Sequence, residues 1–157
     1  MDESKISRFA QLAEIVASIG VIATLLFLAF EVQQNSSLVR TSMYESTMQA
    51  VNEWRMYLVE DKESRELYFR YEREGVDDFS QNEIDHLLVL QNSLWSIYER
   101  AYFAQQRELL GSAEWGRFET HICDQYSRSE QFWRDRVQLY LTREFKDYVL
   151  RECDDGA

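Results

Sequence analysis

The sequence predicts an all-α protein in which an N-terminal transmembrane helix precedes a soluble bundle of about four to six helices. Residues 15–30 form an apolar run without charge or proline, and Glu14 and Glu31 stand on either side of it. The 157 residues contain no proline and only 5 glycines, so few residues interrupt a helix. After the run, apolar residues recur at steps of three and four, which is typical of helices that pack on helices.

The length of the apolar run decides whether it can span a bilayer. Its 16 residues make a helix of about 24 Å, shorter than the ~30 Å hydrocarbon core. Residues 12–32 give about 31 Å and place both glutamates near an interface, where a charge costs less than at the centre. We therefore expect a membrane anchor over residues 1–36, with its span at about 12–32, and an acidic helical domain over residues 37–157.

Two other interpretations of the run remain open. A cleaved signal peptide has a cationic start and a cleavage site with small residues, whereas here Asp2 and Glu3 stand beside Lys5 and Arg8 and the run ends in Phe-Glu-Val-Gln-Gln. A buried helix of a soluble bundle is the second alternative, because the run is slightly short for a span.

The positive charges around the run predict its orientation. Lys5 and Arg8 precede it, and Arg40 is the only basic residue in the eighteen that follow Val32. Basic residues favour the cytoplasmic side, so we expect the amino end in the cytoplasm and the larger domain outside.

Charge and composition limit the partners of the domain. The formal net charge is -11, which disfavours nucleic acid and anionic lipid headgroups. Acidic residues alternate with basic ones, as in residues 61–66 and 71–74, which is typical of solvated helix faces with local ion pairs.

The first helices of the domain follow from periodicity and from their ends. Residues 37–60 carry one apolar stripe, made of Tyr44, Met48, Val51, Trp54 and Leu58. A shorter helix over about 64–74 stops at Gly75. Ser80 and Glu83 form a capping box that opens the longest soluble helix, which extends to about Leu110. On that helix we expect Trp95 to be buried against the 44–58 segment.

Three further helices complete the predicted bundle. Gly111-Ser112 separates the long helix from one that carries Trp115, Phe118 and Ile122 on one face. Ser129 is a candidate cap for the next helix, whose apolar residues are Phe132, Trp133, Val137 and Tyr140. The last helix runs from Thr142 to about Arg151.

Several segments together resemble a group of small, uncharacterised bacterial membrane proteins. These segments are the exit of the apolar run at residues 31–35, the start of the long helix at 79–83, and residues 98–103, 108–115 and 140–149. The resemblance covers most of the chain and implies one N-terminal transmembrane helix, a helical soluble domain and a bacterial inner-membrane location. It brings no known activity. Gln33 stands where a basic residue is common in the group.

Two clusters have residue types that bind metals. Glu83 and His86 match the Glu-x-x-His spacing of di-iron bundles. Such a site needs a second copy of the motif, but the other histidine, His121, has Phe118 instead of a glutamate three residues before it. His121 and Cys123 are two residues apart, and side chains at that spacing diverge on a helix. We therefore predict no catalytic residue, metal or cofactor.

The two cysteines leave the redox state open. Cys123 and Cys153 can form a disulfide if the domain is extracytoplasmic, and are free thiols if it is cytoplasmic.

Small residues recur along the predicted span. Ala13, Ala17, Gly20 and Thr24 form a seam that leads to Glu31, and small residues let two helices approach closely in lipid. Such residues are also simply common in spanning helices.

Two classes of function follow from these patterns. The first is a non-enzymatic accessory or scaffold subunit that contacts membrane lipid and self-associates or joins another membrane protein. The second is a membrane-tethered metal-binding or catalytic bundle. The scarcity of convergent polar residues favours the first.

Overall fold

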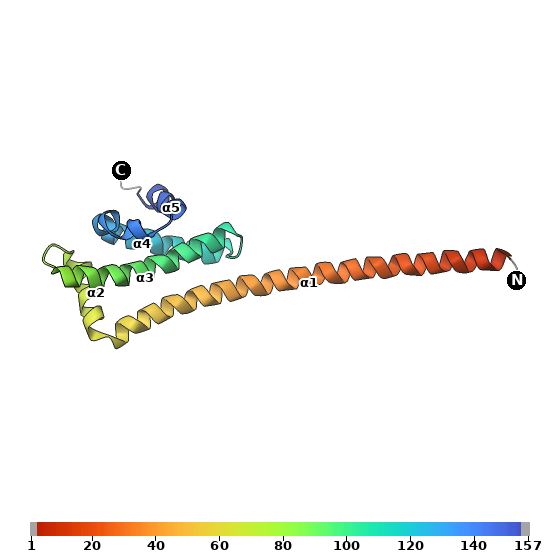
Figure 1. The fold of residues 1–157 in the computed structure, drawn as a ribbon, viewed down its shortest axis with the longest axis horizontal. Helices are drawn as coiled ribbons and strands as arrows, with labels where there is room; N and C mark the ends of the chain where they lie inside the picture. Colours follow the sequence, from red (N-terminus) through yellow and green to blue (C-terminus); the bar gives the residue numbers. More distant parts are fainter. Residues whose placement is uncertain (1–2, 155–157) are drawn as a thin grey trace. The chain divides into compact units, whose positions relative to one another are not determined.

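The computed structural model describes residues 3–154, with side chains for Glu14 and for residues 16–154. The described chain is helical and has no strand (Figure 1). Its elements are α1 (Glu3–Glu60), α2 (Lys62–Glu74), α3 (Gln81–Gln106), α4 (Ser112–Asp135), the 3-10 turn η1 (Val137–Tyr140) and α5 (Arg143–Cys153). The all-α prediction is confirmed.

The chain divides into two units, Met1–Thr41 and Ser42–Ala157. Helix α1 contributes to both, because it runs without interruption to Glu60. The apolar stripe of residues 37–60 predicts a separate helix that begins at Ser37; in the structure the helix ends at Glu60 as predicted, but there is no break at Ser37. No glycine or proline lies between Gly20 and Glu60, so this part of α1 contains no strong helix-breaking residue.

Helix α2 has a cap at each end. The Asp61 carboxylate accepts a hydrogen bond from the Ser64 backbone N–H at 3.1 Å, so the helix begins earlier than the predicted Ser64. Gly75 ends it with φ 74°, a conformation that glycine adopts without steric cost, as predicted.

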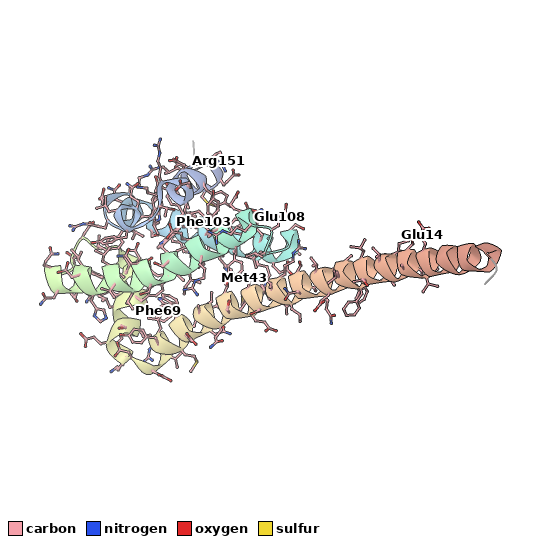
Figure 2. All side chains as sticks on the ribbon, turned by 45° about the vertical axis from the view of Figure 1, so that its right-hand side comes forward. Glu14, Met43, Phe69, Phe103, Glu108 and Arg151 are labelled. Atoms are coloured by element: carbon pink, nitrogen blue, oxygen red, sulfur yellow. A yellow bond between two sulfur atoms is a disulfide. The ribbon has the colours of Figure 1, made fainter. Side chains whose placement is uncertain are left out.

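Helix α3 begins as predicted and ends earlier. Both hydrogen bonds of the Ser80–Glu83 capping box are present. At the other end, Leu109 N–H donates to Ala104 O at 2.8 Å and Glu108 N–H donates to Gln105 O at 2.9 Å, while Glu108 has φ 57°. This is a Schellman motif with a glutamate at its left-handed position, and Figure 2 labels Glu108 at this end of α3.

The segment after Ser112 differs from the prediction in two respects. The break predicted at Ser129 is present as a kink inside α4, with φ −130° and ψ 17°. The Ser129 hydroxyl does not cap the residues that follow; it donates to Gln125 O at 2.5 Å, a type of bond that often bends helices. Val137 is fully buried in η1, whereas Tyr140, predicted to face the core, is 64% exposed. The expected periodicity of 3.6 residues fails where the chain becomes a 3-10 turn.

Aromatic side chains form the centre of the core in the second unit. Trp95, Trp133 and Phe145 are fully buried, and the Trp95 ring lies 5.6 Å from Trp133 and 6.2 Å from Phe145, measured between ring centroids. The burial predicted for Trp95 is confirmed. These two aromatic neighbours come from α4 and α5.

Candidate functional site

The apolar stretch of α1 is exposed around its whole circumference. Over residues 16–32 every described side chain is exposed, and Leu26, Phe27 and Phe30 are about two-thirds or more exposed, at 67%, 67% and 71%. A helix that is apolar on all sides requires apolar surroundings, which a bilayer core supplies. Among the described residues, α1 is the one helix that is long and apolar enough to cross a membrane, judged by length and composition alone.

The predicted seam occupies one face of this stretch. At 100° per residue, Ala17, Gly20, Thr24 and Glu31 lie within about 60° of one another on the helix surface. The Thr24 hydroxyl donates to Gly20 O at 2.8 Å, and apart from the adjacent backbone of α1 no heavy atom lies within 4 Å of the position that a Cβ on residue 20 would occupy. The hydroxyl is therefore satisfied inside its own helix and the face is open. Ala13, the first member of the seam, lies outside the described side chains.

The Glu83–His86 pair has structural partners. Glu83 accepts from Ser80 in the capping box and pairs with Arg70. The hydrogen bond from Arg70, together with those from Ser80, lowers the pKa of Glu83 to about 2. The pair lines a groove of about 930 Å³ between α2 and α3, and no group of three possible metal-ligating side chains occurs among the described residues.

His86 belongs to a hydrogen-bonded corner that the sequence pattern does not indicate. Its Nε2 lies 2.8 Å from the hydroxyl oxygen of Ser64, and the Ser64 hydroxyl donates to the Tyr57 hydroxyl at 3.2 Å. The Tyr57 hydroxyl in turn lies 3.5 Å from the Asp61 carboxylate that caps α2. Ser64 is fully buried, so its hydroxyl is not accessible as a nucleophile. The Ser64–His86 contact instead holds the α1–α2 corner against α3. Only the folded chain brings these residues together.

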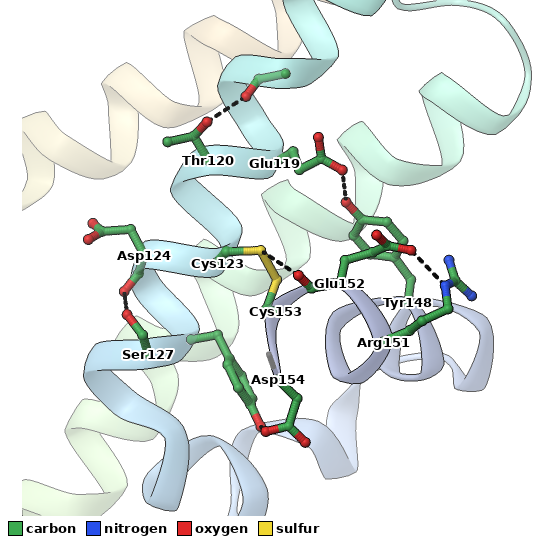
Figure 3. Close-up of a disulfide and its surroundings, with 12 residues drawn as sticks. Glu119, Thr120, Cys123, Asp124, Ser127, Tyr148, Arg151, Glu152, Cys153 and Asp154 are labelled. Atoms are coloured by element: carbon green, nitrogen blue, oxygen red, sulfur yellow. Dashed lines mark hydrogen bonds and ion pairs between the residues drawn. A yellow bond between two sulfur atoms is a disulfide. The ribbon is translucent and has the colours of Figure 1, made fainter. Parts of the chain in front are cut away.

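Cys123 and Cys153 are joined by a disulfide that links α4 to the end of α5 (Figure 3). Their Cα atoms lie 4.8 Å apart. Polar contacts support the same junction: the Tyr148 hydroxyl donates to Glu119 at 2.8 Å. The bonded sulfurs are not thiolates, so His121, which is exposed, has no cysteine ligand beside it.

Comparisons with protein-family models, with curated proteins and with solved structures found no match for this chain. What the sequence and the structure define is an all-helical protein with one long apolar N-terminal helix that is a candidate membrane span.

Proposed function

We propose that the protein is a single-pass membrane protein whose anchor is residues 1–36 and which acts as a non-enzymatic accessory or scaffold subunit through protein–protein contacts. The observation that carries the proposal is the exposed apolar circumference of α1 over residues 16–32. In water this surface would be a large apolar patch, and its hydration is unfavourable. Lipid tails or neighbouring apolar helices cover the same surface without that free-energy cost.

The partner of the anchor is another transmembrane helix, either a second copy of this chain or that of another membrane protein. Lipid tails are as apolar as the helix, so close packing decides association within a membrane. The face with Ala17, Gly20 and Thr24 permits such packing, because its side chains are small and the Thr24 hydroxyl needs no outside partner.

The larger domain lies on the extracytoplasmic side of a bacterial inner membrane. Structural disulfides persist in oxidising compartments and are rare in the cytosol, and this domain has one between Cys123 and Cys153. The basic residues Lys5 and Arg8, which precede the apolar run, favour the same orientation.

The association is tested with Gly20→Leu and a matched variant, Ser18→Leu. Ser18 and Gly20 are two residues apart in sequence, which places their side-chain positions about 160° apart around the helix axis. Both variants therefore add one leucine, but only Gly20→Leu adds it to the seam. We expect wild type and Ser18→Leu to migrate as a complex in blue-native electrophoresis, and Gly20→Leu to migrate as a single chain while remaining membrane-inserted. Migration of wild type as a single chain would contradict the proposed association, and equal complexes in all three would contradict the seam.

The orientation is tested by the state of the two cysteines in cells. We expect acid-quenched cells to yield protein that reacts with a polyethylene glycol maleimide only after reduction, with two labels added. Two labels without reduction would place Cys123 and Cys153 in a reducing compartment and reverse the proposed orientation.

A further inference from the structure

A polar pocket lies where α1, α3 and α4 meet within residues 42–157. It consists of two cavities of about 150 Å³ and 50 Å³ that share the side chains of Val51, Arg55, Tyr98 and His121. We call this the junction pocket. It is separate from the groove between α2 and α3, and neither the anchor nor the disulfide contributes to it.

The floor of the junction pocket is buried and polar. Gln125 is 7% exposed and Tyr68 6% exposed, and the Tyr68 hydroxyl donates to Gln125 Oε1 at 3.2 Å. Tyr98 lines both cavities, and its hydroxyl has no hydrogen-bond partner among the described residues. Burial raises the pKa of Tyr98 to about 12, so its hydroxyl is protonated at neutral pH and remains a donor.

The rim of the pocket is cationic although the protein is acidic. Arg55 comes from α1, while Arg117 and His121 stand one turn apart on α4. Neither arginine pairs with a carboxylate of the described residues, and Arg117 Nη1 donates to the Tyr44 hydroxyl at 3.0 Å. The carboxylate on this rim, Asp124, is paired with Arg128 at 3.0 Å.

The smaller cavity adds an apolar wall made of Met48, Val51 and Phe118. A ligand of this pocket therefore needs an anionic group for the arginines and an apolar body for the wall. Guanidinium groups suit planar carboxylates, and an anion without an apolar body leaves the wall unused. An extended polyanion such as nucleic acid is opposed by the net charge of -11.

We propose that the junction pocket binds a small organic carboxylate. Arg55 and Arg117 hold the carboxylate from opposite helices, and the Tyr98 hydroxyl donates a third hydrogen bond. Ligand binding in this pocket joins three helices of the domain, and it does not depend on the anchor spanning a membrane.

Benzoate is a suitable probe, measured by equilibrium dialysis of labelled benzoate against the full-length protein in detergent. We expect saturable 1:1 binding with a Kd of ~1 mM or tighter. The Arg55→Gln and Arg117→Gln variants should each weaken it by about tenfold, because each removes a charge-assisted hydrogen bond. Arg143→Gln is the matched control, since this arginine is 88% exposed and pairs with Asp147 away from the pocket; it should bind benzoate as wild type does.

The neutral amide of the same shape, benzamide, and inorganic phosphate complete the test. We expect benzamide to bind at least tenfold more weakly than benzoate, and phosphate not to compete. Equal binding of benzamide would show that the arginines do not select a carboxylate. Tighter binding of phosphate than of benzoate would contradict the role of the apolar wall, and equal loss in Arg143→Gln or absence of saturation would overturn the site.

Discussion

Removal of the Cys123–Cys153 disulfide should destabilise the helical domain by an amount that the chain connectivity fixes. The two cysteines are separated by 30 residues, and the bond restricts this loop in the unfolded chain. Loop-closure entropy for that length corresponds to about 3.7 kcal/mol at 25 °C. We expect Cys123→Ala/Cys153→Ala to lower the free energy of unfolding by ~2–4 kcal/mol, because residual structure in the unfolded chain can reduce the contribution of a bridge below the entropic value.

The folded structure should survive this change. Helix α5 is also held by buried Phe145 and Val149, and by a hydrogen bond from Tyr148 to Glu119. The double variant should therefore keep its helix content and its near-ultraviolet circular dichroism, and differ from wild type mainly in the midpoint of urea unfolding.

Urea unfolding of the full-length protein in detergent, with and without dithiothreitol, provides the assay. Reduction should lower the stability of wild type to that of the double variant and leave the variant unchanged. A loss below 1 kcal/mol in reduced wild type, or a response of the variant to dithiothreitol, would refute the entropic argument.

Three further predictions concern the same domain. Trp95→Ala should cost ~3–5 kcal/mol in urea unfolding, because the indole is fully buried between other rings, and an unchanged midpoint would place it at the surface. Glu108→Gly should raise stability by about 1 kcal/mol, since it removes the steric cost of φ 57°, and destabilisation would show that the glutamate side chain matters more. Glu83→Gln should lower stability at neutral pH. Because the pKa of Glu83 falls from 4.5 to about 2 on folding, the wild-type advantage is complete above pH 4.5 and should vanish as pH falls towards 2; a constant gap would contradict this.

Local chemistry made most helix ends predictable from the sequence. The Ser80–Glu83 box and the glycine at 75 act through hydrogen bonds and backbone freedom within a few residues, so their sequence signals hold in the structure. The end of α3 was predicted too late in the sequence, because Glu108 takes the left-handed position that glycine usually fills. The helix start predicted at Ser37 was wrong, because the apolar stripe of residues 44–58 shows which face of the helix packs and not where the helix begins.

The polar sites were less predictable than the fold. The Ser64–His86 contact joins residues 22 positions apart, and the junction pocket combines Arg55, Tyr98 and His121 from three helices. Their convergence depends on tertiary packing, which periodicity does not encode. The one local signal for the pocket was the spacing of four between Arg117 and His121, which places two basic groups on one helix face.

The central proposal, that residues 12–32 anchor the chain in a membrane, is tested most directly by alkaline carbonate extraction of membranes that contain the full-length protein. We expect the protein to stay in the membrane pellet, because lipid covers the apolar circumference of α1. Release into the supernatant with peripheral proteins would contradict it, and the exposed surface of residues 16–32 would then be a docking face for a soluble partner.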